Sequence, residues 1–305
     1  MNKEYQVVII GGGPAGLSAG LYTSRARLST LLIERGLVGG LITETELVEN
    51  YPGFPEGISG LELGQLMHQQ ATKYGLEILL AEITGLELKQ GQKIIKTTEG
   101  NFTAKAVIIA SGSERLKLGV PGEKEFAGKG VSYCATCDAA FFRELPVAVA
   151  GGGDVGITEA LHLAKFASKV TVIELLPKLG ASRILQERAA AEPKIEFRLN
   201  TRIEEIEGEE VVKGLRLRRV TTGGKYTLDV AALFVSIGIK PNTAYLKGVL
   251  PLDAAGAVIT NDKLETDVPG TFAAGDVRQS SAQQAITAAG DGATAAIYAE
   301  KFISE

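Results

Sequence analysis

The chain has 305 residues, of which 45% are apolar and 22% are charged, and its formal net charge is −4. These values are typical of a globular protein long enough for two domains, and mild acidity without a basic stripe argues against nucleic acid as the main partner. No apolar run reaches the length of about 18 residues that a membrane helix needs. Because no export signal is visible, we expect a cytoplasmic protein.

A glycine-rich turn near the N-terminus joins a predicted strand to a predicted helix. The strand is the apolar run Gln6–Ile10, and the turn is the Gly-Gly-Gly-Pro-Ala-Gly sequence Gly11–Gly16. In this context G-x-G-x-x-G binds the pyrophosphate of a dinucleotide at the helix N-terminus. A second strand, Thr30–Ile33, ends at Glu34, 21 residues after Gly13, where a carboxylate suits the hydroxyl pair of a ribose.

The two cysteines, Cys134 and Cys137, are separated by two residues and followed by Asp138. Two intervening residues at the start of a helical turn keep the Cα atoms within the roughly 7 Å that a disulfide allows, and the stretch Ala139–Leu145 is expected to supply that turn. The positive end of the turn would favour the thiolate that carries out exchange. Half a zinc site or two unreactive thiols are the alternatives, but zinc normally needs four ligands. We predict a redox-active disulfide and no metal site.

The glycine-rich pattern recurs directly after the cysteine pair. Strand Pro146–Ala150 leads into the Gly-Gly-Gly-Asp-Val-Gly sequence Gly151–Gly156, and strand Lys169–Ile173 ends at Glu174, again 21 residues after the middle glycine, Gly153. One such loop is weak evidence of a nucleotide site. Two copies with the same strand, helix and acid predict that the chain binds two dinucleotides.

The C-terminal third completes the first of these units. Strand-like Thr271–Ala274 precedes Gly275 and Asp276 and a helix that opens near Ala282–Ala285, and it matches the return strand Val107–Ala110. We therefore expect an α/β protein with three-layer architecture and two Rossmann-like dinucleotide-binding domains, the second inserted into the first. The first domain would span residues 1–115 and 243–305, and the second residues 116–242. Within the second, strands are predicted at 196–199, 215–220 and 233–237, with Glu204–Lys213 as a polar surface connection.

Together these motifs closely resemble the low-molecular-weight thioredoxin reductases, class II of the pyridine nucleotide-disulfide oxidoreductases. The resemblance covers nearly the whole chain and rests on Gly11–Gly16, Gly39-Gly40, Val48–Phe54, Cys134–Asp138 and the stretch from Ala274 to Gly292. It implies that the first domain binds FAD, that the second binds a nicotinamide nucleotide, and that the protein is a homodimer. A thioredoxin- or glutaredoxin-like protein would be the substrate.

The resemblance also implies the residues of each cofactor site. For FAD they are Gly11, Gly13, Pro14, Ala15, Gly16, Glu34, Arg35, Gly39, Gly40, Leu41, Asn50, Ala110, Ser111, Gly112, Gly275, Asp276, Gln284 and Ala285. For the nicotinamide nucleotide they are Gly151, Gly153, Asp154, Val155, Gly156, Glu174, Ile237 and Gly238. Glu34 would bind the adenosine ribose, Asp276 would accept from the ribityl chain, and the helix near Gln284 would direct its N-terminus at the flavin.

By resemblance, reduced flavin opens the disulfide at Cys137, and Cys134 attacks the disulfide of the protein substrate. Asp138 would relay the proton, with a helix N-cap as its alternative role. The inserted domain would rotate on the chain crossings near Gly119–Gly122 and Gly238–Thr243.

The chain departs from NADPH-using relatives at the end of the second fingerprint. Where those carry His-Arg-Arg, this sequence has Glu174-Leu175-Leu176. A 2′-phosphate would meet a carboxylate and two apolar side chains, so NADH is favoured over NADPH. Reduced ferredoxin or a deazaflavin as electron donor, a flavin dithiol oxidase that uses oxygen, and a redox-sensing flavoprotein stay as alternatives.

Overall fold

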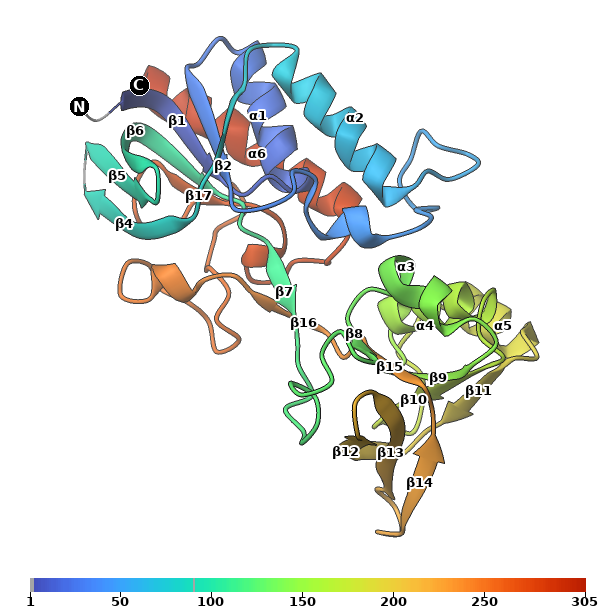
Figure 1. The fold of residues 1–305 in the computed structure, drawn as a ribbon. Coiled ribbons are helices and arrows are strands. Elements are labelled where there is room, and N and C mark those ends of the chain that lie inside the picture. Colours follow the sequence, from blue (N-terminus) through green and yellow to red (C-terminus); the bar gives the residue numbers. More distant parts are fainter. Residues whose placement is uncertain (1–2, 90) are drawn as a thin grey trace. The chain divides into compact units, whose positions relative to one another are not determined.

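The computed structural model describes residues 3–89 and 91–305, and the chain divides into two compact units (Figure 1). The first unit is formed by Met1–Glu114 and Lys240–Glu305, and the second by Arg115–Ile239. The second unit is therefore inserted in the first. The sequence places the two boundaries after residues 115 and 242, and the structure places them after Glu114 and Ile239.

A mixed sheet forms the middle layer of the first unit. Its strands are β1 (Lys3–Ile10), β2 (Thr30–Glu34), β3 (Glu77–Leu80), β4 (Ile83–Lys89), β5 (Gln92–Thr97), β6 (Gly100–Ile109) and β17 (Thr271–Ala273). They lie in the order β3-β2-β1-β6-β5-β4, with β17 also paired to β6. The pairs of β1 with β2 and β6, and of β17 with β6, are parallel, whereas β4 and β5 form an antiparallel hairpin.

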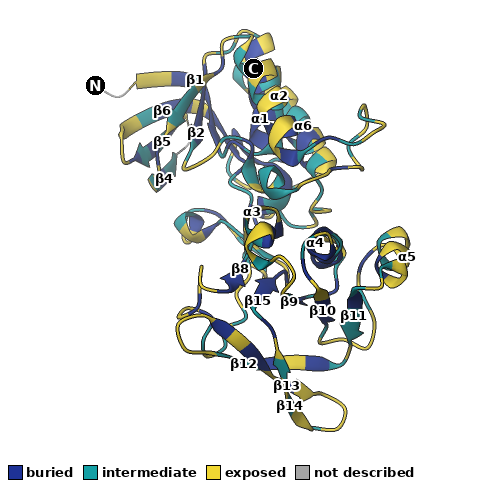
Figure 2. Ribbon diagram, turned by 45° about the vertical axis from the view of Figure 1, so that its right-hand side comes forward, coloured by how far each residue is buried: buried dark blue, intermediate teal, exposed yellow. Residues whose placement is uncertain are grey.

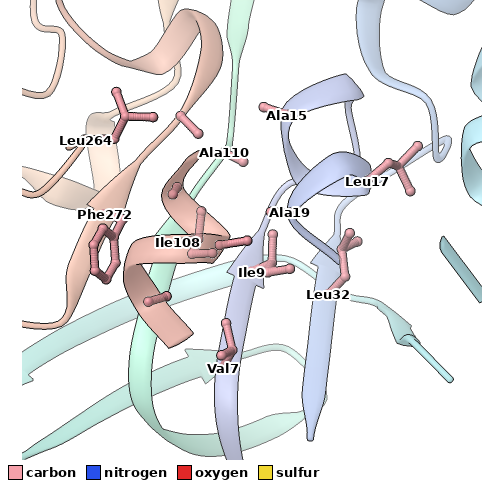
Figure 3. Packing of buried hydrophobic residues seen from close by; sticks show 14 of the residues in the cluster. Val7, Ile9, Ala15, Leu17, Ala19, Leu32, Ile108, Ala110, Leu264 and Phe272 are labelled. Atoms are coloured by element: carbon pink, nitrogen blue, oxygen red, sulfur yellow. The ribbon is translucent and has the colours of Figure 1, made fainter. Parts of the chain in front are cut away.

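Three helices cover one face of this sheet: α1 (Pro14–Arg25), α2 (Gly60–Thr72) and α6 (Ala285–Ser304) (Figure 1). Val7 and Ile9 of β1 point into this layer and pack with Leu17 of α1 (Figure 3). Helices α1 and α6 approach closely, because a Cβ on Gly292 would lie 2.0 Å from the carbonyl oxygen of Ala15. The C-terminal helix is thereby fixed beside the first glycine-rich turn.

The opposite face of the same strands is also buried. Val8 and Ile10 alternate with the residues that face the helices, and they pack with Leu250 and Val258 from the segment between the inserted unit and β17. Strands buried on both faces read as continuous apolar runs. This explains why β1 shows no alternation of polar and apolar residues.

The second unit repeats this plan around a parallel sheet of order β11-β10-β9-β15-β8. Its strands are β8 (Val131–Ser132), β9 (Pro146–Ala150), β10 (Lys169–Ile173), β11 (Ile195–Arg198) and β15 (Ala232–Val235). Helices α4 (Asp154–Ala164) and α5 (Arg183–Ala191) pack on one face, and an antiparallel sheet of β12 (Thr201–Gly208), β13 (Val212–Arg219) and β14 (Lys225–Asp229) packs on the other. The central strands are coloured as buried in Figure 2.

The prediction of a surface connection at Glu204–Lys213 is wrong, because most of this segment belongs to β12 and β13. Ile203 and Ile206 are 5% and 2% exposed and face the sheet core. A bulge between Ile203 and Glu205 leaves the inward-facing Ile203 and Ile206 three positions apart, whereas a regular strand would space them by two or four. The period-2 pattern is therefore absent from the sequence, although the strand is present.

The chain passes between the units through two short strands that pair with each other, β7 (Ser113–Arg115) and β16 (Ile239–Pro241). Close to these strands, Gly119, Gly122 and Gly238 have φ values of 71°, 85° and 115°. Residues with a Cβ rarely adopt such values. The crossings thus depend on glycine at these positions.

Candidate active site

The two cysteines form a disulfide on a short helical turn of the second unit. The turn is α3 (Ala135–Asp138), and the Cα atoms of Cys134 and Cys137 are 5.4 Å apart. Cys134 is the N-cap residue, because its Sγ accepts a hydrogen bond from the Cys137 N–H at 3.2 Å. The expectation that Ala139–Leu145 supplies the turn is wrong. Because Cys134 itself caps the turn, the helix begins at Ala135, between the two cysteines.

Asp138 ends α3 and is half-buried. A 3-10 turn, η2 (Ala139–Phe142), follows it, and the Asp138 side chain makes no cap hydrogen bond to η2. The hydrogen bonding therefore does not favour the role of an N-cap. The carboxylate stays a candidate for the proton relay.

The first glycine-rich turn holds the acid predicted from the sequence. Glu34 accepts from the Gly12 N–H at 2.7 Å and from the Gly36 N–H at 2.8 Å. Gly11 has φ 108°, and a Cβ on Gly16 would lie 1.8 Å from the carbonyl oxygen of Gly11. Only glycine fits either position, so helix α1 starts directly against the end of β1.

The second glycine-rich turn reproduces these contacts. Glu174 accepts from the Gly152 N–H at 2.6 Å and from the Leu176 N–H at 2.9 Å. A Cβ on Gly156 would lie 2.1 Å from the carbonyl oxygen of Gly151. In both units a later glycine N–H also donates to the turn, from Gly39 to Gly12 O at 2.8 Å and from Gly180 to Gly152 O at 2.9 Å. The two fingerprints therefore have the same hydrogen-bonded framework.

Three exposed side chains around the second turn are apolar. Leu175 and Leu176 are 45% and 57% exposed, and Val155 in the first turn of α4 is 52% exposed. Asp154 is held by the following loop, since its Oδ1 accepts from the Ser182 N–H at 2.6 Å. Lys178 and Arg183 are also exposed. Leu175 and Leu176 therefore present apolar side chains directly after Glu174.

The C-terminal segment brings two further predicted residues next to the first turn. Gly275 and Asp276 lie in the 3-10 turn η4 (Gly275–Val277), and a Cβ on Gly275 would be 3.0 Å from the Cβ of Ala15. Asp276 Oδ1 accepts from the Ser281 hydroxyl at 2.9 Å, and burial raises the pKa of the Asp276 carboxyl. Gln284 is the N-cap residue of α6, and its Oε1 accepts from Asn50 Nδ2 at 3.0 Å.

The other predicted residues of the first unit lie in turns, after strand ends or at the start of α1. Ser111 donates from Oγ to the carbonyl oxygen of Asn242 at 2.9 Å, and Gly112 has φ 61°. Gly40 and Leu41 begin the 3-10 turn η1 (Gly40–Glu44), where a Cβ on Gly40 would be 2.8 Å from Gly13 Cα. The remaining ones are Ala110, which is buried, Arg35, which is exposed, and Pro14, at the first position of α1.

Ile237 and Gly238 directly follow Ser236, at the end of β15 in the second unit. A Cβ on Gly151 would lie 2.1 Å from the Ser236 carbonyl oxygen. The predicted nicotinamide-nucleotide residues therefore gather at the carboxyl end of the parallel strands. Ligands bind there in doubly wound sheets.

Sequence reasoning missed two buried carboxylates beside the dithiol, Glu123 and Glu159. They are 3% and 8% exposed. A usable signal existed for Glu159, which shares the apolar face of α4 with Ala160 and Leu163. A charged residue on such a face calls for a buried partner. Glu123 lies in a loop and gave no comparable signal.

Comparison with known proteins identifies the family. The model of the pyridine nucleotide-disulphide oxidoreductases matches residues 5–292. The chain belongs to this family. It is 44% identical to the thioredoxin reductase of Bacillus subtilis (strain 168) over 304 residues, which cover 99% of this chain and 96% of that protein.

Solved structures agree. The crystal structure of Lactococcus lactis thioredoxin reductase in its FR conformation has a TM-score of 0.96 and 42% identity, covering 98% of this chain and 99% of that one. Thioredoxin reductase of T. acidophilum has a TM-score of 0.94 and 35% identity, with coverage of 98% and 99%. The fold class, the resemblance and the prediction of a flavin-dependent disulfide oxidoreductase with a redox-active cysteine pair are confirmed.

Within the described part of the chain, no three His, Cys, Asp or Glu side chains gather as a metal site would require. Among residues 3–89 and 91–305, no helix combines the length and the apolar character needed to cross a bilayer.

Proposed function

We propose that this protein reduces the disulfide of a thioredoxin- or glutaredoxin-like protein at Cys134–Cys137, with FAD held by the first unit and NADH by the second. The observation that carries the proposal is the closed Cys134–Cys137 bridge in a chain with two matching dinucleotide fingerprints. The relatives described above are thioredoxin reductases, which supports the substrate class. FAD, when bound, supplies the two-electron carrier between the nicotinamide and the disulfide.

The residues of the first unit fit FAD. Helix α1 has no side-chain N-cap, so its first N–H groups are available for a pyrophosphate. A carboxylate offers about four acceptor positions, so Glu34 can bind a ribose hydroxyl in addition to Gly12 and Gly36. Asp276 uses one oxygen for Ser281 and can accept from a ribityl hydroxyl with the other. The lack of a side chain at Gly40 leaves room along the turn, because a Cβ there would meet Gly13.

The residues of the second unit favour NADH over NADPH. Helix α4 also lacks a side-chain N-cap, and Glu174 occupies the place that Glu34 has in the first unit. Its free acceptor positions suit a ribose 2′-hydroxyl. Compared with a site that offers an arginine, the 2′-phosphate of NADPH would lose at least one charge-assisted hydrogen bond here. Such a bond is worth about 1.5–3 kcal/mol, which is a factor of ten or more in affinity.

The dithiol is arranged for exchange chemistry. The N–H groups at the start of α3 stabilise a negative charge on Cys134 Sγ, which already accepts from Cys137 N–H. We assign the attack on the substrate disulfide to Cys134, proximity to the flavin to Cys137, and the transfer of the proton to Asp138. We extend the proposal to a homodimer, which the family resemblance implies, located in the cytoplasm. Light scattering on the purified holoprotein tests the dimer.

The test of the donor is anaerobic mixing of the oxidised holoprotein with NADH, NADPH, reduced ferredoxin and reduced deazaflavin in turn, with the flavin absorbance as readout. NADH is expected to bleach the flavin at least tenfold faster than NADPH at the same concentration. Faster bleaching by NADPH contradicts the proposal that Glu174 binds the ribose 2′-hydroxyl of NADH. If neither nucleotide bleaches the flavin, the electron donor is reduced ferredoxin or deazaflavin. Subsequent oxidation of the reduced protein by a thioredoxin tests the substrate, and release of hydrogen peroxide in air at a comparable rate would instead indicate an oxidase.

A further inference from the structure

Two buried carboxylates of the second unit, Glu123 and Glu159, each connect the dithiol turn to the same stretch of chain. That stretch is Arg115–Gly119, here called the crossing segment because the chain enters the second unit through it. The residues that they reach at the dithiol are Tyr133 and Ala135, which flank Cys134 in the sequence.

Glu123 accepts three hydrogen bonds. Its Oε1 accepts from the Leu118 N–H at 2.8 Å and from the Tyr133 hydroxyl at 2.7 Å, and its Oε2 accepts from the Gly119 N–H at 2.7 Å. Burial and the neighbouring carboxylate raise the pKa of Tyr133, so this hydroxyl keeps its proton and remains a donor. Glu123 therefore ties the residue before Cys134 to the backbone of the crossing segment.

Glu159 makes the second connection, from helix α4. Its Oε1 accepts from Arg115 Nη1 at 3.0 Å and its Oε2 accepts from the Ser236 hydroxyl, while the backbone amide of Ala135 lies against the carboxylate. The Ala135 N–H is the first of α3 and would otherwise lack a partner within the helix. Glu159 thus ties the residue after Cys134 to Arg115 and to the end of β15.

We propose that Glu123 and Glu159 are positioning residues of the redox pair, which clamp the dithiol turn to the crossing segment and lower the reduction potential of Cys134–Cys137. The proposal uses the redox pair of the family and is independent of the donor and of the substrate.

The clamp acts mainly by restricting the conformations of the dithiol turn in the reduced state. In the oxidised protein the disulfide itself fixes the turn, so the clamp adds little to its order. After reduction that covalent restraint is lost, and the contacts to Tyr133 and Ala135 then keep the backbone on both sides of Cys134 in place beside Cys137. A dithiol held in this way closes again more readily, because less chain entropy is lost when the bridge re-forms. This effect favours the disulfide.

The test measures the equilibrium of the holoprotein with mixtures of reduced and oxidised dithiothreitol under anaerobic conditions. In this exchange the reagent loses two electrons and closes its own disulfide, while Cys134–Cys137 opens to two thiols. After acid quenching and alkylation, mass spectrometry counts the thiols directly, because the chain has two cysteines. The variants are Glu123→Gln, Glu159→Gln, Tyr133→Phe and the double variant of Glu123→Gln with Tyr133→Phe.

We expect the ratio of dithiol to disulfide to rise about three- to tenfold in each single variant, tenfold being about 30 mV for a two-electron couple. The double variant should show no more than the larger single effect, because both changes interrupt the same connection from Tyr133 through Glu123 to the crossing segment. The matched control is Glu125→Gln, an exposed carboxylate in the same loop, which should leave the ratio unchanged.

An unchanged or lower ratio in variants that retain FAD and wild-type thermal stability overturns the proposal, as does an equal rise in the control. Additive effects of Glu123→Gln and Tyr133→Phe overturn the connection through Tyr133. If the glutamine variants fail to fold, Tyr133→Phe and Ser236→Ala, which each remove one hydroxyl, decide the outcome by the same measurement.

Discussion

Lys93 is a lysine buried in the sheet of the first unit, and replacing it by methionine should stabilise the protein. Lys93 lies on β5, its exposed fraction is 0%, and its Nζ has no hydrogen-bond partner among the described residues. The nearest favourable contact is the ring of Phe302, whose centroid is 5.3 Å from Nζ. Burial lowers the pKa of Lys93.

The expected effect follows from what the substitution keeps and removes. Methionine retains the buried aliphatic stem and removes an amine whose unsatisfied burial costs about 1–3 kcal/mol. A cation–π contact with Phe302 would offset about 0.5–1 kcal/mol of that cost while the amine is charged. We expect a net rise in the free energy of unfolding of about 1–2 kcal/mol at pH 7.

The effect should also depend on pH. The folded pKa lies below the unfolded value of 10.5, so between these two values the unfolded chain binds more protons. Stability of the native sequence therefore increases with pH in this window, by up to about 1.4 kcal/mol per pH unit. The methionine variant lacks this contribution, so its advantage should shrink as the pH rises towards 10.5.

Urea unfolding of the holoprotein at several pH values, followed by circular dichroism and by flavin release, measures both quantities. The matched control is Lys96→Met on the same strand, where Lys96 forms an exposed ion pair with Glu87 at 2.7 Å. Such pairs contribute about 0–1 kcal/mol, so this control should be neutral or slightly destabilised. A destabilised Lys93→Met protein, or an advantage that does not change between pH 7 and 10, would refute the reasoning.

Three further predictions concern the candidate site. Cys134→Ser and Cys137→Ser should each abolish reduction of a protein disulfide while the donor still bleaches the flavin, and near wild-type disulfide reduction by either variant contradicts the exchange mechanism. Asp276→Ala should weaken FAD binding by about 1–3 kcal/mol, the cost of losing a hydrogen bond to a charged group, as measured by fluorescence of released FAD; unchanged affinity would exclude Asp276 from the site. Leu176→Arg should raise the rate of flavin bleaching by NADPH relative to NADH about tenfold, and an unchanged ratio would show that the 2′-phosphate does not approach this loop.

The sequence by itself determined both glycine-rich turns and the dithiol. At Gly11 and Gly16 the requirement is local, because one position needs a positive φ and the other allows helix and strand to touch. The offset of 21 residues to Glu34 and Glu174 reflects a strand–helix–strand unit of fixed size. Such short-range constraints leave a readable pattern, and the fold class and family followed from them.

Tertiary structure alone decided the features that depend on distant parts of the chain. The bulge in β12, where this strand pairs with β13, removed the alternation that would have marked a strand at Ile203. The Glu159 carboxylate meets Arg115, which lies 44 residues away, and Lys93 reaches Phe302 on the C-terminal helix. Contacts over such separations are set by the packing of whole layers. They impose no spacing on the sequence that a reader could recognise.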